Sequence, residues 1–396
     1  MKRFLDQLKE NIFSVSLVLI IFIALFSVKL IPIFIAIIFL LWILKFRSFQ
    51  GFSSKRKWIW PFLFYAIVFG IAFFFSENPK DAVKILERHV SFLVLPLFIY
   101  CKEWKISDIQ FFGKFYVWTI LTIAFFSIFN LLYFYSTHVD FVAEMDDTYL
   151  QWKLPHLTGF HPTYYGFLIV IATIILLEDV INIKLILKSK SFYIAVFLSF
   201  YLLYISPRMA IICQCIVWAW FGYQRLFKYK FTKVNKVLLT VVIMFVFVLL
   251  LATSEYFFDK MAKALEDRRF SLWSPAYDII QSNYFIFGEG LGNGKIYLNE
   301  YISKHRLSQF KGTDLHNQYL MNMVDLGVIG LIALLLILIR PLHYFKDRGI
   351  VLFIIVTSIS MMSESFLYVI KGIVMFIVLS SYFIIRSQLM LVKNQD

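Results

Sequence analysis

Residues 317–339 read NQYLMNMVDLGVIGLIALLLILI, and this stretch decides the fold class. Asp325 is its single charged residue, and every later residue in the stretch is apolar or glycine. As a helix it is long enough to cross a bilayer core, which needs roughly 20 apolar residues. Further apolar runs cover residues 12–28, 30–44, 59–75, 88–100, 115–135, 163–181, 191–205, 209–223, 237–253, 350–363 and 366–385. The pattern predicts an all-α, polytopic membrane protein with about 12 transmembrane helices.

The composition agrees with a chain that lives in a membrane. Of the 396 residues, 60% are hydrophobic and 16% are charged, and the mean hydropathy is +0.76. These values exclude a cytosolic enzyme, a secreted disulfide scaffold and a nucleic-acid-binding domain. The cysteines, Cys101, Cys213 and Cys215, lie within apolar runs or at the end of one, so no disulfide framework is expected.

Charge is distributed unequally between the gaps that separate the apolar runs. When the N-terminus is placed in the cytoplasm, most of the 39 Lys and Arg residues fall in the gaps and tails on that side. The positive-inside rule therefore predicts that both termini are cytoplasmic. Anionic headgroups then account for the formal net charge of +14, so we expect membrane lipids as partners and no nucleic acid.

One long segment lies outside the membrane in this topology. We expect residues 1–253 to hold transmembrane helices 1–9, residues 254–315 to form a long outer segment, and residues 316–396 to hold helices 10–12 and a cytoplasmic tail. Helical spacing of apolar residues before and after Pro275 predicts that the outer segment is mainly helical.

Glycines alternate with other residues from Gly288 to Gly294 in the outer segment. A dinucleotide-binding fingerprint would need a further glycine at the position of Asn293 and a preceding strand, so that interpretation fails. The pattern predicts a turn whose backbone N–H groups face outward, where they could meet an anion.

Two residues near the ends of apolar runs are candidates for chemistry. Arg208 follows Ser206-Pro207, which suggests a broken helix; the arginine either faces a polar cavity or extends to the headgroups. His316 opens the tenth run, and we expect Asp314 or Thr313 to cap that helix with His316 in its first turn. The alternative for His316 is an interfacial histidine that only satisfies a helix end.

Other charged residues are weaker candidates. Arg268 and Arg269 are adjacent on an amphipathic segment, where a solvated helix face is the default interpretation. Arg88 and His89 end a segment with helical spacing, for which a helix end lying at the surface is the default.

A last pair of ionisable residues lies near the final apolar runs. Glu364 and Lys371 are spaced to share nearly one helix face, which favours a structural role. The chain shows no spacing of residues typical of a metal site and no catalytic triad.

The order of several motifs resembles that of the O-antigen ligase and polymerase family. The similarity extends over roughly Phe192 to Phe383. The motifs that carry it are Ser206-Pro207-Arg208, the run from Arg268 to Trp273, the glycine turn from Gly288 to Gly292, His316-Asn317-Gln318-Tyr319-Leu320, and the run from Asp325 to Gly330. Asp325 stands where many members of the family carry Glu.

The resemblance implies an activity and a site. Members are multi-span enzymes that take a glycan from an undecaprenyl-pyrophosphate carrier on the periplasmic side of the bacterial inner membrane. It implies Arg208 and either Arg268 or Arg269 as pyrophosphate-binding residues, with His316 closest to the transferred bond. Arg88 is added as a substrate-binding residue on physical grounds.

The expected chemistry follows from these side chains. Arginines bind phosphate oxygens through fixed pairs of donors, so neither a divalent metal nor a cofactor is required. A histidine can accept the proton of an attacking hydroxyl near neutral pH. We therefore predict a metal-independent glycosyltransferase that acts by inversion, with His316 as the base and the lipid A core or another glycan as the acceptor.

Two alternatives to a ligase stay open. A polymerase of the same family would transfer the growing chain to the next lipid-linked repeat. A polysaccharide-lipid transporter or flippase would also have many spans and scattered intramembrane charges, although no internal repeat supports it.

Overall fold

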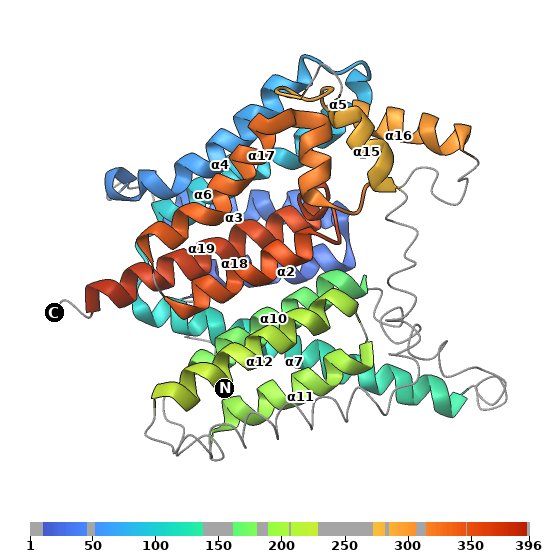
Figure 1. The fold of residues 1–396 in the computed structure, drawn as a ribbon. Helices are drawn as coiled ribbons and strands as arrows, with labels where there is room; N and C mark the ends of the chain where they lie inside the picture. Colours follow the sequence, from blue (N-terminus) through green and yellow to red (C-terminus); the bar gives the residue numbers. More distant parts are fainter. Residues whose placement is uncertain are drawn as a thin grey trace. The chain divides into compact units, whose positions relative to one another are not determined.

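The computed structural model describes residues 11–45, 52–137, 161–179, 189–205, 207–228, 272–281, 285–305, 314–345 and 347–393. Within these ranges every regular element is a helix, which confirms the predicted all-α class (Figure 1). The chain divides into two compact units: unit 1 comprises residues 1–115 and 268–396, and unit 2 comprises residues 116–267.

The predicted apolar runs coincide with helices wherever the structure describes them, and run 237–253 lies outside the described residues. These helices are α2 (Ile12–Phe26), α3 (Ile31–Lys45), α4 (Phe52–Phe73), α6 (Ser91–Cys101), α7 (Ile106–Thr137), α10 (Pro162–Asp179), α11 (Lys190–Ile205), α12 (Arg208–Lys228), α17 (Gln318–Tyr344), α18 (Arg348–Met361) and α19 (Ile370–Lys393).

Length and apolarity identify the strongest membrane spans among the described helices. Three are long and apolar enough to cross a bilayer: Ile106–Phe134, Gln318–Tyr344 and Ile370–Val392. Six shorter apolar helices accompany them. The chain is a membrane protein, whereas the number of about 12 spans stays a prediction.

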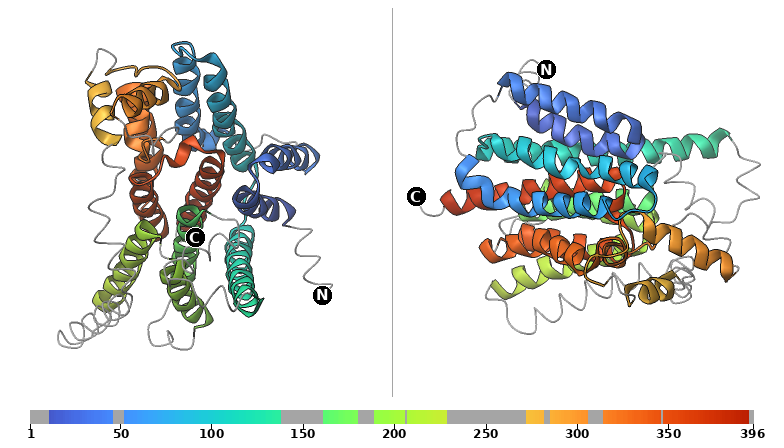
Figure 2. Two further views of the ribbon diagram at one scale, coloured as in Figure 1. Left: turned by 90° about the vertical axis from the view of Figure 1, so that its right-hand side faces the viewer. Right: turned by 90° about the horizontal axis from the view of Figure 1, so that it is seen from above.

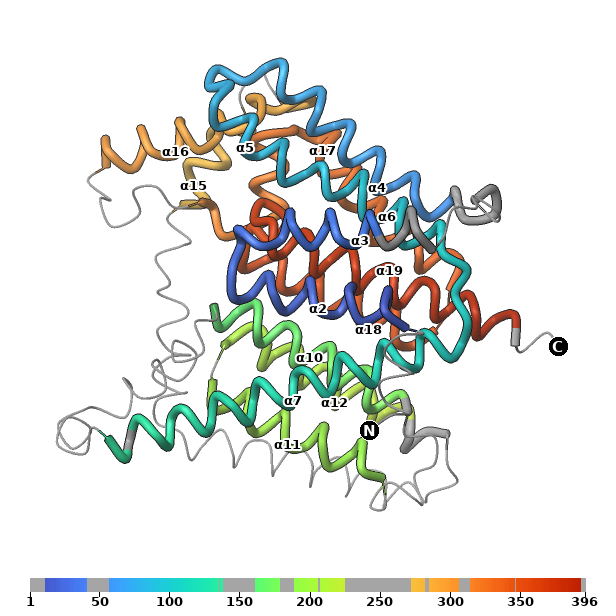
Figure 3. The backbone as a smooth tube through the Cα atoms, turned by 180° about the vertical axis from the view of Figure 1, so that it is seen from behind, coloured from blue at the N-terminus to red at the C-terminus, as the bar shows by residue number. Residues whose placement is uncertain are grey.

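Helix α19 forms the centre of unit 1. Every residue from Ile373 to Ile385 is buried. Helices α2, α6 and α18 pack against α19, and α2 pairs with α3 on one side of it (Figure 3). Helix α4 lies between α6 and α17 and contacts both. Apolar side chains thus surround the last helix of the chain, whose burial fixes its first turn relative to its neighbours.

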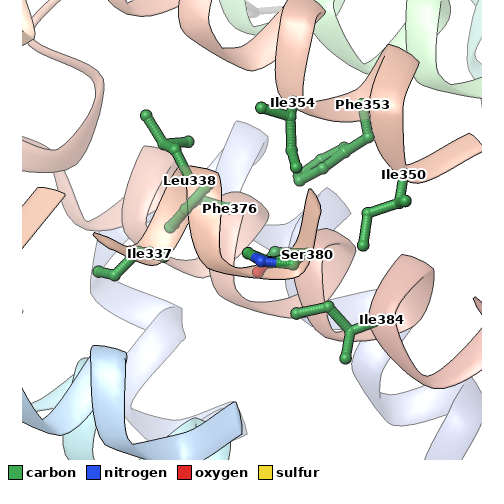
Figure 4. Close-up of a pocket in the computed structure, with 9 residues that line it drawn as sticks. Ile337, Leu338, Ile350, Phe353, Ile354, Phe376, Ser380 and Ile384 are labelled. Atoms are coloured by element: carbon green, nitrogen blue, oxygen red, sulfur yellow. The ribbon is translucent and has the colours of Figure 1, made fainter. Parts of the chain in front are cut away.

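A small pocket lies between three of these helices (Figure 4). Its single side-chain hydroxyl, that of Ser380, donates a hydrogen bond to the backbone oxygen of Ile377. The pocket has no titratable residue in its lining, so it is a packing gap and not a reaction site. The lining residues are Ile337, Leu338, Pro341, Ile350, Phe353, Ile354, Phe376, Ser380 and Ile384.

Unit 2 is held together by helices α10, α11 and α12. A methyl group added to Gly166 of α10 would lie 2.6 Å from Cγ of Pro207, so only glycine allows this close approach. Deeper in the unit, Gln214 Nε2 donates to Thr173 Oγ1 at 3.1 Å and to Ser199 Oγ at 2.6 Å. These bonds join the three helices through polar groups that apolar surroundings would otherwise leave unsatisfied.

Helix α17 is two helical segments that meet at Gly327. The backbone of Gly327 has φ 64° and ψ −161°, a conformation essentially restricted to glycine. The break frees the N–H groups of Val328 and Ile329, which donate instead to the backbone oxygens of Phe285 (3.0 Å) and Ile286 (3.3 Å). The apolar run at 317–339 therefore forms a bent element and not one straight helix.

The glycine turn packs against this bend. The N–H groups of Gly292 and Gly294 donate to the two carboxylate oxygens of Asp325, each at 3.2 Å, and that of Glu289 donates to the backbone oxygen of Val324 at 2.8 Å. The expectation that these N–H groups face outward toward an anion is wrong, because the protein itself uses them.

Three shorter helices stand near the same end of unit 1. They are α5 (Pro79–His89), α15 (Trp273–Ile280) and α16 (Asn293–Lys304). Helices α15 and α16 lie beside the first segment of α17 (Figure 2). Asp325 binds the first turn of α16 and its preceding residue, so this carboxylate acts as the cap of α16.

Candidate functional site

His316 lies just before α17 and has an unusual backbone. Its φ is 46°, in the left-handed region that residues other than glycine rarely adopt. The His316 N–H donates to Asp314 Oδ1 at 2.9 Å. The helix cap is Asn317, whose side-chain oxygen accepts from the N–H groups of Tyr319 (3.0 Å) and Leu320 (3.2 Å).

The predicted geometry of this helix start was therefore wrong in two respects. Asn317 caps the helix in place of Asp314 or Thr313, and His316 precedes the first turn. The physical reason is that an Asn with extended backbone satisfies two free N–H groups at once. After the left-handed turn at His316, its imidazole contacts a second segment of the chain.

Glu364 is the partner of His316 from that second segment. His316 Nδ1 lies 3.3 Å from Glu364 Oε2 and 3.5 Å from Asp314 Oδ1. The Glu364 side chain is 8% exposed and that of His316 is 26% exposed, so the carboxylate is nearly buried while the ring still reaches the surface. An ionised carboxylate only accepts hydrogen bonds; Nδ1 then carries the hydrogen, and Nε2 is the basic nitrogen.

Glu364 and Lys371 do not share a helix face, which corrects the prediction from their spacing. Glu364 lies in the turn between α18 and the short helix η5 (Phe366–Tyr368), and Lys371 lies in the first turn of α19. An attractive electrostatic interaction nevertheless joins Lys371 to Glu364. The link between the last two long helices therefore brings a cation and a carboxylate to the His316 segment.

Arg88 approaches the same link from α5. Its Nη1 donates to the backbone oxygen of Tyr368 at 3.1 Å, and the side chain is only partly buried. Cationic side chains from α5 and α19 thus border the segment that carries Glu364. The structure places Arg88 at this site; its predicted role in substrate binding stays a prediction.

His89, next to Arg88, is 1% exposed, so the expectation of a surface-lying helix end is wrong for this residue. Its ring stacks on Phe69 with 3.6 Å between ring centroids, and Nδ1 lies 2.8 Å from the backbone oxygen of Ile85. Burial lowers the pKa of His89 to about 3. His89 is therefore a neutral, packed residue that anchors the end of α5.

The structure does not relate the other three predicted arginines to His316. Arg208 is the first residue of α12 in unit 2, and the break predicted from Ser206-Pro207 is confirmed, since α11 ends at Ile205. Arg268 and Arg269 lie outside the described residues. The approach of these three arginines to His316 stays a prediction.

The described part of the chain contains no group of three His, Cys, Asp or Glu residues arranged to hold a metal ion. Its chemistry-bearing cluster in unit 1 is instead an imidazole, two carboxylates and two cations: His316, Asp314, Glu364, Arg88 and Lys371. Such a cluster can accept a proton at the imidazole and attract an anionic group nearby.

Sequence reasoning missed Glu364 as the partner of His316. The two residues are 48 positions apart, with the whole of α17 and α18 between them. The signal that could have found Glu364 is its position, because an acidic residue in a short link between two apolar runs must lie near a membrane surface or in a protected site.

The fold and the cluster together define a helical membrane protein with a histidine–carboxylate pair beside cationic side chains. Residues 193–335 match the family model described as O-antigen ligase, which is the family that the motifs resemble. Members of this family are membrane glycosyltransferase-like enzymes, ligases and polymerases. No curated protein matches the chain.

Proposed function

We propose that this protein transfers a glycan from an undecaprenyl-pyrophosphate carrier to a sugar hydroxyl on the periplasmic side of the inner membrane. The observation that carries the proposal is the pair formed by His316 Nδ1 and Glu364 Oε2, 3.3 Å apart, within a chain whose residues 193–335 match the O-antigen ligase family. An oriented imidazole is the group that a transfer to a hydroxyl needs.

The reaction begins with proton acceptance. Nε2 of His316 accepts the proton as the acceptor hydroxyl attacks the anomeric carbon of the donor glycan. A new bond forms between that carbon and the hydroxyl oxygen, and the bond from the carbon to the phosphate oxygen breaks. The electron pair leaves with the diphosphate, and direct displacement inverts the configuration at the sugar carbon. Glu364 stabilises the imidazolium that forms, as a carboxylate does for any adjacent cation.

Cationic side chains would neutralise the departing diphosphate. Arg88 and Lys371 border the segment that carries Glu364 in unit 1. Arg208, Arg268 and Arg269 are proposed to add permanently charged donors, whose planar geometry suits phosphate oxygens. Because these cations would stabilise the negative charge of the departing diphosphate, the proposed reaction needs neither a divalent metal nor a cofactor.

The His316→Ala substitution tests the assignment. The assay supplies purified protein in detergent with a defined lipid-linked oligosaccharide and a glycan acceptor. We expect turnover to fall by at least about 100-fold, since general-base catalysis contributes about 10² to 10⁴, while donor binding stays near that of the wild type. Wild-type turnover in the variant would refute the role of His316, and movement of the lipid-linked glycan across vesicles without a new glycosidic bond would favour a transporter.

The acceptor separates a ligase from a polymerase. For a ligase, the acceptor is the lipid A core or another final glycan, and loss of the gene leaves long chains on the carrier lipid. Loss of a polymerase instead leaves single repeats on the final acceptor. We propose the ligase because the long single outer segment at residues 254–315 precedes His316. Single repeats on the final acceptor after deletion would overturn that choice.

A further inference from the structure

We propose that Gln318 is a positioning residue that holds Glu364 against His316, and this inference rests on the proposed function. His316 and Glu364 come from segments separated by the whole of α17 and α18. A contact of 3.3 Å between their side chains requires a fixed relation between the start of α17 and the link before α19. Gln318, the first residue of α17, provides a direct bond between those two segments.

The bond is short and buried. Gln318 Oε1 accepts a hydrogen bond from the backbone N–H of Leu367 at 2.6 Å, and the Gln318 side chain is 0% exposed. Leu367 is in η5, three residues after Glu364, and Gln318 is two residues after His316. The bond therefore joins the same two segments as the His316–Glu364 pair, and it is buried more deeply in the protein than that pair.

Hydrogen bonds among buried groups of the protein fix the orientation of the Gln318 amide group. Its Nε2 donates to Asn322 Oδ1 at 2.7 Å, and Asn322 Nδ2 lies 3.2 Å from the backbone oxygen of Gly330 and 3.1 Å from Tyr65 Oη. Asn322 and Tyr65 are each 0% exposed. This chain of bonds assigns Oε1 of Gln318 as the acceptor, because Nε2 must be the atom that donates to Asn322 Oδ1.

Two other contacts between the segments do not replace the Gln318 bond. Tyr368 Oη donates to the backbone oxygen of Met321 at 3.4 Å, a long bond, and also bonds to the Asp325 side chain, but neither contact gives the Leu367 N–H an acceptor. A buried N–H without a partner is costly, so loss of the Gln318 acceptor should displace the backbone at Leu367. Glu364, on the same short link, then moves away from His316.

The measurable consequence is the proton affinity of the His316 imidazole. Three charged groups face this ring or its carboxylate partner, namely Asp314, Glu364 and Lys371, and Arg88 binds the same link at the backbone oxygen of Tyr368. Of these, Glu364 is the nearest carboxylate. A carboxylate beside an imidazole favours the protonated ring, so separation of the pair lowers the pH at which His316 becomes neutral.

Gln318→Met removes the acceptor while it keeps the length of the side chain. The readout is the rate at which diethylpyrocarbonate modifies His316 between pH 4.5 and 8 (about the range where histidine titrates), followed by mass spectrometry of the peptide in the full-length chain. We expect the midpoint to fall by about 1 pH unit in Glu364→Gln and by a comparable amount in Gln318→Met. The double variant should fall no further than Glu364→Gln alone, because both changes act through one carboxylate.

Tyr65→Phe is the matched control, since it removes a hydroxyl from the same network and leaves the Gln318–Leu367 bond in place. Its midpoint should equal that of the wild type. If Gln318→Met does not accumulate as folded protein, Gln318→Leu, which also lacks an acceptor for the Leu367 N–H, should show the same fall. A wild-type midpoint in the Gln318 variant that folds, with a lowered midpoint in Glu364→Gln, would overturn the inference.

Parallel transfer assays keep this result separate from the proposed function. We expect Gln318→Met to lower kcat by about 10-fold with little change in KM for the lipid-linked donor, as a general base loses orientation. If His316→Ala keeps full turnover, the proposed function fails whatever the Gln318 midpoint shows. If His316→Ala is inactive and Gln318→Met keeps the wild-type midpoint and kcat, the positioning role alone fails.

Discussion

At the scale of single residues, the candidate base His316 occupies a backbone conformation that its side chain does not favour. A left-handed backbone costs a residue other than glycine roughly 1 kcal/mol or more. Asp314 and Asn317 hold this turn on either side, through bonds to the N–H groups of His316, Tyr319 and Leu320. The backbone conformation at His316 therefore lowers stability while its imidazole contacts Glu364. Such local strain is typical of functional positions.

The His316→Asn variant should separate this backbone cost from the chemistry. Asn tolerates the left-handed region better than His, so we expect a melting temperature in detergent equal to that of the wild type or a few degrees higher. Transfer activity should be lost, because an amide does not accept a proton at neutral pH. A clear loss of thermal stability would show instead that the imidazole is needed to hold the turn.

His89 gives a prediction about how the stability of the folded protein depends on pH. Its folded pKa, about 3, lies below the unfolded value of 6.5, because burial opposes the charged form. The unfolded chain therefore binds one more proton between these values, and stability falls as the pH drops from 6.5 toward 3. At pH 5 this residue should lower the free energy of unfolding by about 2 kcal/mol relative to pH 7.5, at 1.36 kcal/mol per unit.

The measurement compares unfolding of the wild type and His89→Gln at the two pH values in the same detergent. His89→Gln keeps a donor for the Ile85 oxygen and has no titrating ring, so its stability should change less over this interval. Equal pH dependence of the two proteins would contradict a neutral, buried His89.

At the scale of elements, the bend at Gly327 organises the end of unit 1 that holds the site. His316 lies just before the first segment of α17, which has Gln318 in its first turn, and the bend binds the backbone oxygens of Phe285 and Ile286 ahead of the glycine turn. A helix without this break would leave the carbonyl oxygens of residues 285 and 286 without those partners. The bend thus links the start of α17 to the outer segment that precedes it.

Gly327→Ala should disrupt this arrangement. An added methyl group would meet the backbone oxygen of Ile286, and φ 64° with ψ −161° is closed to alanine. We expect a loss of about 2 kcal/mol or more in unfolding free energy, together with faster proteolysis in residues 285–292. Gly70→Ala is the control: a methyl group there meets nothing within 4 Å, and alanine favours the helix. Equal stability of the two variants would mean that the bend is not a constraint.

The helices also show how much of the fold could be predicted from the sequence. Apolar length predicted the helices because that signal is local and strong in membrane chains. The same signal missed the bend, since a glycine within an apolar run is compatible with a straight helix until a partner such as Ile286 is placed beside it. It also did not predict the start of α16, which depends on Asp325 from a distant part of the chain.

At the scale of the whole molecule, the candidate site was predicted in part. The motif order predicted His316 as the candidate base and the match of residues 193–335 to the family model, because these depend on residue types in sequence. Glu364 and Gln318 required the packing of α17 against the last helices, which no local pattern encodes. Arg88 was a physical inference, and its bond to Tyr368 places it at the link that carries Glu364.

The role of Arg208 is the prediction that belongs to the whole chain, because Arg208 is in unit 2 and His316 is in unit 1. If both serve one diphosphate, Arg208→Gln should weaken donor binding by about 10-fold to 100-fold. That range follows from about 1.5–3 kcal/mol for a hydrogen bond to a charged group and 1.4 kcal/mol per tenfold change in affinity. The measurement is equilibrium binding of a lipid-linked oligosaccharide to the purified full-length chain.

Arg340→Gln serves as the matched control for Arg208, since Arg340 lies near the far end of α17 from His316 and also carries one guanidinium. Its donor affinity should remain that of the wild type, whereas a general effect of lost positive charge would weaken both variants equally. Arg208→Lys should recover only part of the binding, because an ammonium group lacks the two parallel donors of a guanidinium. Full affinity in Arg208→Gln would remove Arg208 from the diphosphate site and leave the cations of unit 1, Arg268 and Arg269 included, as the candidates for binding the diphosphate beside the His316–Glu364 pair.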